Sequence, residues 1–255
     1  MAPTVPVIDD DPYAVENLID PYPLFDRMRA AGPAVWLSQH DVLAFTSDAT
    51  VRDILLDHQT FINGAGVGPK NLHHEQAWRT PGILETDPPM HTAMRTAMTD
   101  VISPRGVRTL REQFQVYADE LVDSVVDAGE FDGVTEFAEK FPLRVFADAV
   151  GIPRDGREAN LLPHGAMNFS TFGPENDLHR QYFELGEPTR DWVMANCARE
   201  NLTPDGLGAQ IWQHADAGSI SPEQATLLVR ALLSAGLDST VLAIVNVLRL
   251  LLDNP

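Results

Sequence analysis

The sequence predicts a mainly α-helical protein with a small β element near its N-terminus. From residue 87 onward, residues that start and stop helices follow one another with little between them. A long apolar run, ALLSAGLDSTVLAIVNVLRLLL, covers residues 231–252. Alternation typical of strands is clearest in AVWLSQHDVLAFT, residues 34–46. With 255 residues, 44% of them hydrophobic, the chain can bury a sizeable core.

The first 86 residues combine short elements with one long loop. Residues 1–22 are rich in Pro and Asp and predict a mostly extended lead-in. The elements expected next are a helix from Pro23 to Ala31 stopped by Gly32-Pro33, a hairpin over Ala34 to Thr46 turning near Gln39-His40-Asp41, and a helix capped by Asp48 and ending near Asp57. A loop from about Phe61 to Thr86 follows. A loop this long in a compact domain is often functional.

Helices are expected over almost all of the remaining chain. Their ranges are Asp87 to Ile102, Ser103 to Ala128, Asp132 to Val150 with Gly151-Ile152-Pro153 as its stop, 156–171, 175–199, 205–217, and Ser221 to Asp253. The last begins with a Ser cap, Pro at the first position and Gln three residues after the cap. It should be roughly 45 Å long at 1.5 Å per residue. Because it is apolar on nearly all sides, we expect a buried core helix.

Composition and charge exclude several classes of protein. The net charge of −19, from 37 acidic and 18 basic residues, argues against binding to nucleic acid or to an anionic membrane. The charges of Arg230, Asp238 and Arg249 argue against a membrane span. One cysteine, Cys197, precludes an internal disulfide and a cysteine-rich metal site. The N-terminus lacks signal-peptide features, so a cytoplasmic protein is expected. Neither a serine-hydrolase motif nor a complete nucleotide-binding loop is present.

The middle of the long helix carries polar residues in an apolar context. Residues at a spacing of four form one polar stripe: Thr226, Arg230, Ser234 and Asp238. Gly236 allows something to approach the backbone closely. The hydroxyls of Ser239 and Thr240 can bond back to the carbonyls four residues earlier and bend the helix. Asp238 and Ser239 side by side in a dry pocket would form a proton-delivery pair. The alternative is a kinked core helix whose polar groups bond to neighbours.

A second group of residues lies in LETDPPMHTAMRTAM, residues 84–98. His91 and Arg95 are four apart and share one face in the first two turns of a helix. Cations near a helix N-terminus are unfavourable with the helix dipole, so two of them indicate an anion nearby. The alternative is a solvated arginine and a surface histidine.

Five stretches together resemble the cytochrome P-450 superfamily in its soluble bacterial form, the haem-thiolate monooxygenases. In chain order they are DPYPLFDRMRAAGPAVWL, DPPMHTAMR, ISPRGV, FPLRVFADAVGIP and AGLDST. The resemblance implies the P-450 fold, truncated after the long helix that crosses the oxygen side of the haem. Residues 1–255 would be the N-terminal portion of a single domain that lacks the thiolate-ligand part. It also implies haem b, dioxygen, and electrons from NAD(P)H through a ferredoxin-type donor.

The resemblance gives roles to individual residues. Asp238 would be the acid and Ser239 the alcohol that guide protons during dioxygen activation, and Gly236 would make room for dioxygen. The family more often has Thr at the position of Ser239. His91 and Arg95 match the residues that hold the haem propionates, with Trp78 as a weaker additional contact.

The substrate class follows from a finer resemblance. WRTPGILETDPP, PHGAMNFSTFGPENDL and LLVRALLSAGLDST resemble a bacterial branch that oxidises para-substituted benzoic acids. By this match Arg79 and Arg230 would attract the carboxylate, and Phe169 and Phe172 would wall the aromatic ring. Arg230 lies about 12 Å before Asp238 along a helix, a distance that suits a small ring. Two departures, Gly82 and Ala231, stand where the branch tends to have hydroxyl side chains. A different acid or a neutral aromatic substrate therefore stays open.

The family's iron ligand is absent from the sequence. Its cysteine lies in a Gly-rich loop after the long helix, and the later Glu-x-x-Arg pair is also missing. Cys197 lies in MANCARENLTP, which predicts a plain buried or partly exposed thiol. The expected function is haem-dependent monooxygenation, by hydroxylation or O-demethylation, complete only with the missing part and inactive without it. The alternatives are a truncated non-enzymatic descendant that binds an apolar ligand or a partner, and an unrelated all-α ligand-binding domain.

Overall fold

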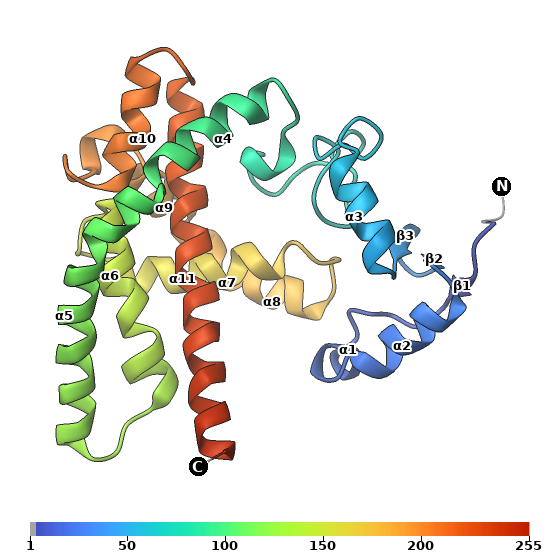
Figure 1. Cartoon of the computed structure of the whole chain (residues 1–255), viewed down its shortest axis with the longest axis horizontal. Coiled ribbons are helices and arrows are strands. Elements are labelled where there is room, and N and C mark those ends of the chain that lie inside the picture. Colours follow the sequence, from blue (N-terminus) through green and yellow to red (C-terminus); the bar gives the residue numbers. More distant parts are fainter. Residues whose placement is uncertain (1–3, 255) are drawn as a thin grey trace. The chain divides into compact units, whose positions relative to one another are not determined.

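A computed structural model describes residues 4–254, and its contacts divide the chain into two compact units (Figure 1). The N-terminal unit comprises the chain up to Asp87 together with Phe172–Asn176, and the helical unit comprises Pro88–Thr171 and the chain from Asp177 onward. Helices dominate and strands occur only before residue 46 among the described residues. The predicted class, mainly α with a small N-terminal β element, is confirmed.

The N-terminal unit contains three short strands and a few short helices. They are β1 (Val7–Ile8), α1 (Val15–Ile19), α2 (Tyr22–Ala31), β2 (Ala34–Leu37), β3 (Val42–Phe45), α3 (Asp48–Leu56) and the 3₁₀ turn η1 (Ile83–Glu85). The sheet order is β1-β2-β3, with β1 parallel and β3 antiparallel to β2. The expected helix and hairpin are confirmed.

The alternation in β2 places its apolar side chains in the core of this unit. Val35 and Leu37 point to the same face and are buried against Leu24 and Met28 of α2. The hairpin turns through Asp41, which has a φ of 55°. Aspartate tolerates this left-handed conformation better than most residues. The period-2 pattern thus fixes which face of the sheet α2 covers.

The mostly extended lead-in also contains β1 and the short helix α1. One expectation for this unit was wrong in detail. The cap of α3 is Ser47 and not Asp48, because the Ser47 hydroxyl accepts a hydrogen bond from the Thr50 N–H at 3.2 Å. Asp48 then lies in the first turn, where a negative charge suits the helix dipole.

The helical unit contains most of the chain. Its elements are α4 (Met90–Val101), α5 (Pro104–Ala128), the π-helical turn η2 (Gly133–Ala138), α6 (Lys140–Val150), α7 (Arg157–Ser170), α8 (Asp177–Gly186), η3 (Glu187–Thr189), α9 (Arg190–Asn196), η4 (Arg199–Asn201), α10 (Leu207–Asp216) and α11 (Pro222–Asp253). Within this unit α11 contacts α6, α10, η2 and α7 (Figure 1). The expected start of α5 and the expected cap of α11 are confirmed: the Ser103 hydroxyl accepts from the Gly106 N–H, and Ser221 forms a capping box with Gln224.

Two helix predictions in this unit were wrong. The expected single helix over 175–199 is interrupted by the 3₁₀ turn η3, which contains Pro188. Proline has no N–H to donate and clashes with the preceding turn, so it interrupts an α-helix. Asp87 does not start α4, which begins at Met90. The carboxylate of Asp87 instead accepts hydrogen bonds from the N–H groups of Asn63 and Gly64 at 2.9 and 2.8 Å.

The expectation that α11 is buried throughout holds only for its first half. The leucine and valine side chains from Leu227 to Leu237 are buried, whereas Leu242, Leu250 and Leu252 are 62%, 62% and 83% exposed. No helix of the part that the structure describes covers those three leucines. By length and composition alone α11 could also cross a membrane, a test that core helices of soluble proteins pass as well. The buried first half of α11 is the behaviour of a core helix.

Candidate functional site

Asp238 is the most unusual ionisable group on α11. Its Oδ2 atom is buried and has no hydrogen-bond partner among residues 4–254. Burial, and to a lesser extent the negative charge of Glu139, raise the pKa of this carboxyl from 3.8 to about 6. Buried polar atoms are normally hydrogen-bonded, so an unsatisfied carboxylate oxygen calls for a reason. An acid with a pKa near neutrality suits proton transfer.

The two hydroxyls beside Asp238 bond back to the helix, as predicted. Ser239 Oγ donates to the carbonyl of Ala235 at 2.6 Å, and Thr240 Oγ1 donates to that of Gly236 at 2.8 Å. These two hydrogen bonds do not interrupt the helix: α11 is continuous from Pro222 to Asp253. Ser239 is exposed on the helix surface. The acid and the alcohol are therefore adjacent, with the alcohol on the open side.

The group that approaches Gly236 closely is the ring of Phe146 from α6. A side-chain Cβ added at Gly236 would lie 2.0 Å from Phe146 Cε1. The space beside Gly236 is thus filled by an aromatic ring. The open surface of α11 is the face that carries Ala235, Ser239 and Leu242, all of which are exposed. Sequence reasoning missed Ala235, although its spacing of four from Ser239 indicated a shared face. The role of Gly236 toward dioxygen stays a prediction.

His91 and Arg95 lie one turn apart in the first half of α4. His91 is partly buried and Arg95 is exposed. Among residues 4–254, neither side chain has a hydrogen-bond or ion-pair partner. Both can donate to an anion that reaches this face of α4. The two side chains lie on one face of α4, as expected, and the helix places them there without an anion.

Arg230 and Phe169 also belong to the helical unit. Arg230 of α11 is 6% exposed. It lies close enough to Cys197 for its positive charge to oppose the effect of burial on that thiol's pKa. Phe169, near the end of α7, is 46% exposed. Arg230 is therefore a buried cation of the core, and Phe169 offers an exposed ring.

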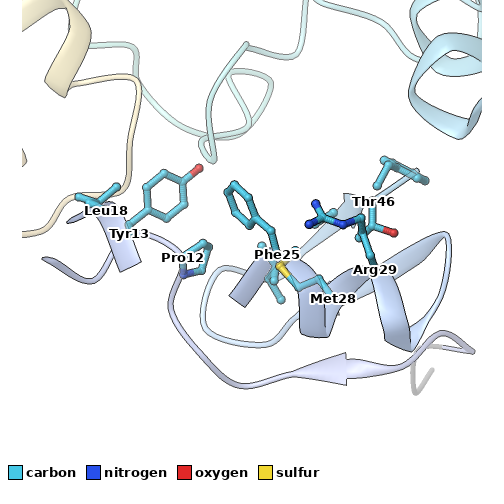
Figure 2. A pocket seen from close by; sticks show the side chains of 10 residues that line it. Pro12, Tyr13, Leu18, Phe25, Met28, Arg29 and Thr46 are labelled. Atoms are coloured by element: carbon cyan, nitrogen blue, oxygen red, sulfur yellow. The ribbon is translucent and has the colours of Figure 1, made fainter. Parts of the chain in front are cut away.

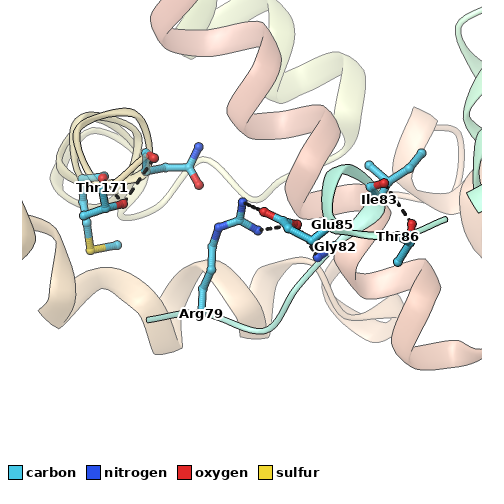
Figure 3. A network of polar contacts seen from close by, with 8 residues as sticks. Arg79, Gly82, Ile83, Glu85, Thr86 and Thr171 are labelled. Carbon is cyan, nitrogen blue, oxygen red and sulfur yellow. Dashed lines mark hydrogen bonds and ion pairs between the residues drawn. The ribbon is translucent and has the colours of Figure 1, made fainter. Parts of the chain in front are cut away.

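Arg79 lies in the N-terminal unit and already has a carboxylate partner. Figure 3 shows its guanidinium facing Glu85, with Nη2 donating to Oε1 at 2.5 Å. The two side chains are only 11% and 6% exposed. Glu85 Oε2 also accepts from the N–H of Gly82 at 2.8 Å (Figure 3). Burial lowers the pKa of Arg79, and the charge of Glu85 opposes this. A substrate carboxylate would have to compete with Glu85.

Aromatic rings flank the Arg79 guanidinium within the same unit. Its Cζ atom lies 5.2 Å from the centre of the Phe172 ring and 5.6 Å from that of Trp78. Both distances are within the range of cation–π attraction. Sequence reasoning had assigned Phe172 to the substrate ring and missed Glu85, six residues after Arg79. The structure brings Arg79 together with Phe172 in one unit, and Arg230 with Phe169 and Asp238 in the other.

Cys197 is an inert core thiol. It is 0% exposed, and burial raises its pKa to about 12. Its carbonyl accepts a hydrogen bond from Trp212 Nε1 at 3.3 Å. Only the thiolate is a good metal ligand or nucleophile. No group of three or more potential metal-ligating side chains occurs among the described residues. The prediction of a plain buried thiol is confirmed.

We expect Cys197 to resist alkylation in the folded protein. At pH 8 iodoacetamide should modify it slowly, and urea should accelerate the reaction by more than about 100-fold, because a thiol must be exposed and ionised to react. Mass spectrometry of the modified protein measures the rate. Equal rates in native and unfolded protein would mean that the thiol is accessible in the fold.

The N-terminal unit also contains a hollow of about 460 Å³ (Figure 2). Its lining is mostly apolar and includes Tyr13, Leu18, Phe25, Met28, Arg29 and Thr46. Burial raises the pKa of the Tyr13 hydroxyl, and Arg29 is paired with Asp26. None of the residues predicted for the site lines this hollow.

Known proteins resemble the chain both in sequence and in fold. It is 43% identical to cytochrome P-450 CYP199A2 of Rhodopseudomonas palustris over 239 residues, which cover 93% of this chain and 58% of that protein. It is 28% identical to erythromycin C-12 hydroxylase of Saccharopolyspora erythraea over 250 residues, which cover 94% of this chain and 61% of that protein. No protein-family model matches the sequence.

A solved structure supports the fold. The crystal structure of CYP109E1 from Bacillus megaterium in complex with testosterone matches with a TM-score of 0.71 at 17% identity, covering 88% of this chain and 58% of that one. The chain thus spans about three fifths of the length of the proteins that it matches. By its sequence similarity and its fold together, the chain belongs to the cytochrome P-450 superfamily.

Proposed function

We propose that this chain provides the oxygen side of a haem-dependent monooxygenase that inserts one oxygen atom of O₂ into a small aromatic acid. The observation that carries the proposal is the acid of α11: Asp238 keeps a buried oxygen without a partner, next to a serine on an open helix face. The membership in the P-450 superfamily supports the reaction class. The single-domain organisation over residues 1–255 stays part of this proposal.

The residues of α4 and α11 fit a haem group. His91 and Arg95 have donors without partners on one face of α4, which suits two propionates. The face of α11 with Ala235 and Ser239 is open and mostly small or apolar, which suits a flat ring system. Haem b, held by a cysteine thiolate, supplies the activation of dioxygen. Cys197 does not suit that role because it is buried and its thiol pKa is about 12.

Proton transfer is the task that α11 would perform. With a pKa of about 6, Asp238 can take up and release a proton at a pH close to neutrality. The hydroxyl of Ser239, which donates to the carbonyl of Ala235, can turn to accept that proton and pass one on. Each turnover consumes two protons and two electrons, and the second oxygen atom leaves as water. We propose NAD(P)H as the electron source and a ferredoxin-type protein as the donor, in the cytoplasm.

The substrate class rests on the cations and the aromatic rings. Arg230 is a buried cation two turns before Asp238, and a buried cation attracts an anion strongly because little water screens it. We propose that Arg230 and Arg79 attract the substrate carboxylate. Phe169 and Phe172 would contact the ring.

The reaction can be tested with para-methylbenzoic acid and ¹⁸O₂. The protein that carries this chain, loaded with haem and supplied with NADH, a ferredoxin and its reductase, should form para-hydroxymethylbenzoic acid that contains one ¹⁸O atom. Oxidation of NADH without a labelled product would contradict the proposal. A protein that takes up an apolar ligand but no haem would support the non-enzymatic alternative instead.

Replacing Arg230 with Leu should weaken binding of para-methylbenzoic acid by about 30-fold or more, since a buried charge-assisted contact is lost. Binding of para-methylbenzamide, which has the same shape without the charge, should change less than about threefold. The measurement is the dissociation constant of each ligand from the haem-loaded protein, with circular dichroism to check folding. Equal losses for both ligands would remove Arg230 as the carboxylate anchor.

A further inference from the structure

Gly165, in the middle of α7, is the residue against which the Asp238 carboxylate rests. A Cβ added at Gly165 would lie 1.9 Å from Asp238 Oδ2 and 2.5 Å from both Cγ and Oδ1. Real contacts of this kind are longer than about 3 Å. All three outer atoms of the carboxylate therefore occupy the space that a side chain at position 165 would need. Figure 1 shows α7 passing α11, which it contacts within the helical unit.

The α7 backbone offers the carboxylate room but no hydrogen bond. N–H groups in the middle of an α-helix are used by carbonyls four residues earlier, so Gly165 has no free donor. This explains why Oδ2 is buried and unsatisfied. On α7 the neighbouring His164 has its Nδ1 3.4 Å from Thr189 Oγ1. From the start of α6, Glu139 adds a negative charge, and Lys140 beside it pairs with Glu158.

We propose that Gly165 is a positioning residue for Asp238: its missing side chain lets the carboxylate rest on the α7 backbone, with the Oδ2 atom buried and without a partner. The inference rests on the proposed function for the use of that acid, but the geometry stands by itself. A larger residue at position 165 would push the carboxylate off α7. The acid would then reach water or another donor and lose the environment that raises its pKa to about 6.

A double-mutant cycle tests the contact on the chain without haem. Gly165→Ala should lower the midpoint of urea unfolding at pH 7 when Asp238 is present. In an Asp238→Ala background the same substitution should be neutral or stabilising, because the clash is gone and Ala favours a helix over Gly. Equal losses in the two backgrounds would overturn the proposal. If Gly165→Ala alone does not fold, folding of the double variant supports it, and failure of the double variant contradicts it.

Gly186 provides the matched control. It is also a buried glycine beside α7, where an added Cβ would lie 2.4 Å from Met167 Cβ and 2.6 Å from the carbonyl oxygen of Pro163. Gly186→Ala should destabilise the protein equally in both backgrounds, because Asp238 is not its neighbour. A dependence of the Gly186→Ala effect on Asp238 would show that the cycle reports general loosening of α7, and would count against the proposal.

The second readout is the titration of Asp238 itself. In ¹³C-labelled protein the side-chain carboxyl carbon should titrate near pH 6, and in Gly165→Ala it should titrate closer to 3.8. An unchanged titration midpoint would overturn the positioning role. Both readouts are independent of monooxygenase activity. If they succeed while no labelled product forms, Gly165 positions Asp238 as inferred and the proposed function fails.

Discussion

Replacing Glu85 with Gln is expected to lower the free energy of unfolding by about 3 kcal/mol, since it leaves the Arg79 guanidinium buried without an opposite charge. The pair is well suited to show this effect. Its two side chains are 11% and 6% exposed, and Glu85 also accepts the N–H of Gly82. Gln keeps the shape and one acceptor but removes the charge. Urea unfolding monitored by circular dichroism measures the change.

The matched control is an exposed pair in the same unit. Arg52 and Asp48 lie 3.3 Å apart with 70% and 85% of their side chains exposed. Removing that pair with Arg52→Gln should change stability by less than about 0.5 kcal/mol. A double replacement of Arg79 and Glu85 by Met and Leu should recover much of the loss, because it removes the unpaired charge. If Glu85→Gln lowers the free energy of unfolding no more than Arg52→Gln does, the buried pair does not stabilise the loop that contains Arg79 and Glu85.

Replacing Asp238 with Asn is expected to slow product formation in the haem-loaded protein by about 100-fold or more, with haem content unchanged. Asn has nearly the same shape but cannot donate and recover a proton, and general acid–base catalysis typically contributes at least this factor. The control is Asp253→Asn at the other end of α11, where the side chain is 63% exposed and 3.7 Å from Arg249. It should leave the rate unchanged. Product formation by Asp238→Asn at the unmodified rate would remove the proton-transfer role.

Local chemistry explains which parts of the fold were predictable. Helix starts at Ser103 and Ser221 depend on residues within one turn, so both starts could be predicted from the sequence. The interruption at Pro188 had an equally local signal, which the prediction of one helix overlooked. The hairpin followed from period-2 alternation. By contrast, Ser47 caps α3 in place of Asp48, because backbone geometry decides between two adjacent capping residues.

The site was predictable only where its features depend on residues within one helix. The buried acid of α11 and its neighbouring hydroxyl follow from one helix, and the bonds of Ser239 and Thr240 to that helix are as expected. What fills the space beside a residue depends on distant parts of the chain. Phe146, ninety residues before Gly236, fills the space beside that glycine, and Gly165 receives the carboxylate of Asp238. Glu85 was likewise missed, because folding of a loop brings it to Arg79.

The central claim is that the fold keeps the Oδ2 atom of Asp238 buried and unpartnered at a cost in stability. The folded protein holds this proton up to about pH 6, whereas the unfolded chain releases it near 3.8. Ionisation of Asp238 therefore destabilises the fold as the pH rises through that window, by up to about 2 kcal/mol for a partly screened group. An Asn at this position carries no such cost, because it does not ionise.

The most direct measurement is the free energy of unfolding of the wild-type protein and Asp238→Asn at pH values from 4 to 8. The two values should be close at pH 4, the Asn variant should become the more stable one as the pH rises from 4 to 6, and the difference should level off above pH 6. Other ionisable groups titrate alike in both proteins, so the difference reports Asp238. A difference that does not change with pH, or a less stable Asn variant at pH 7, would mean that Asp238 has a stabilising partner and would contradict the account.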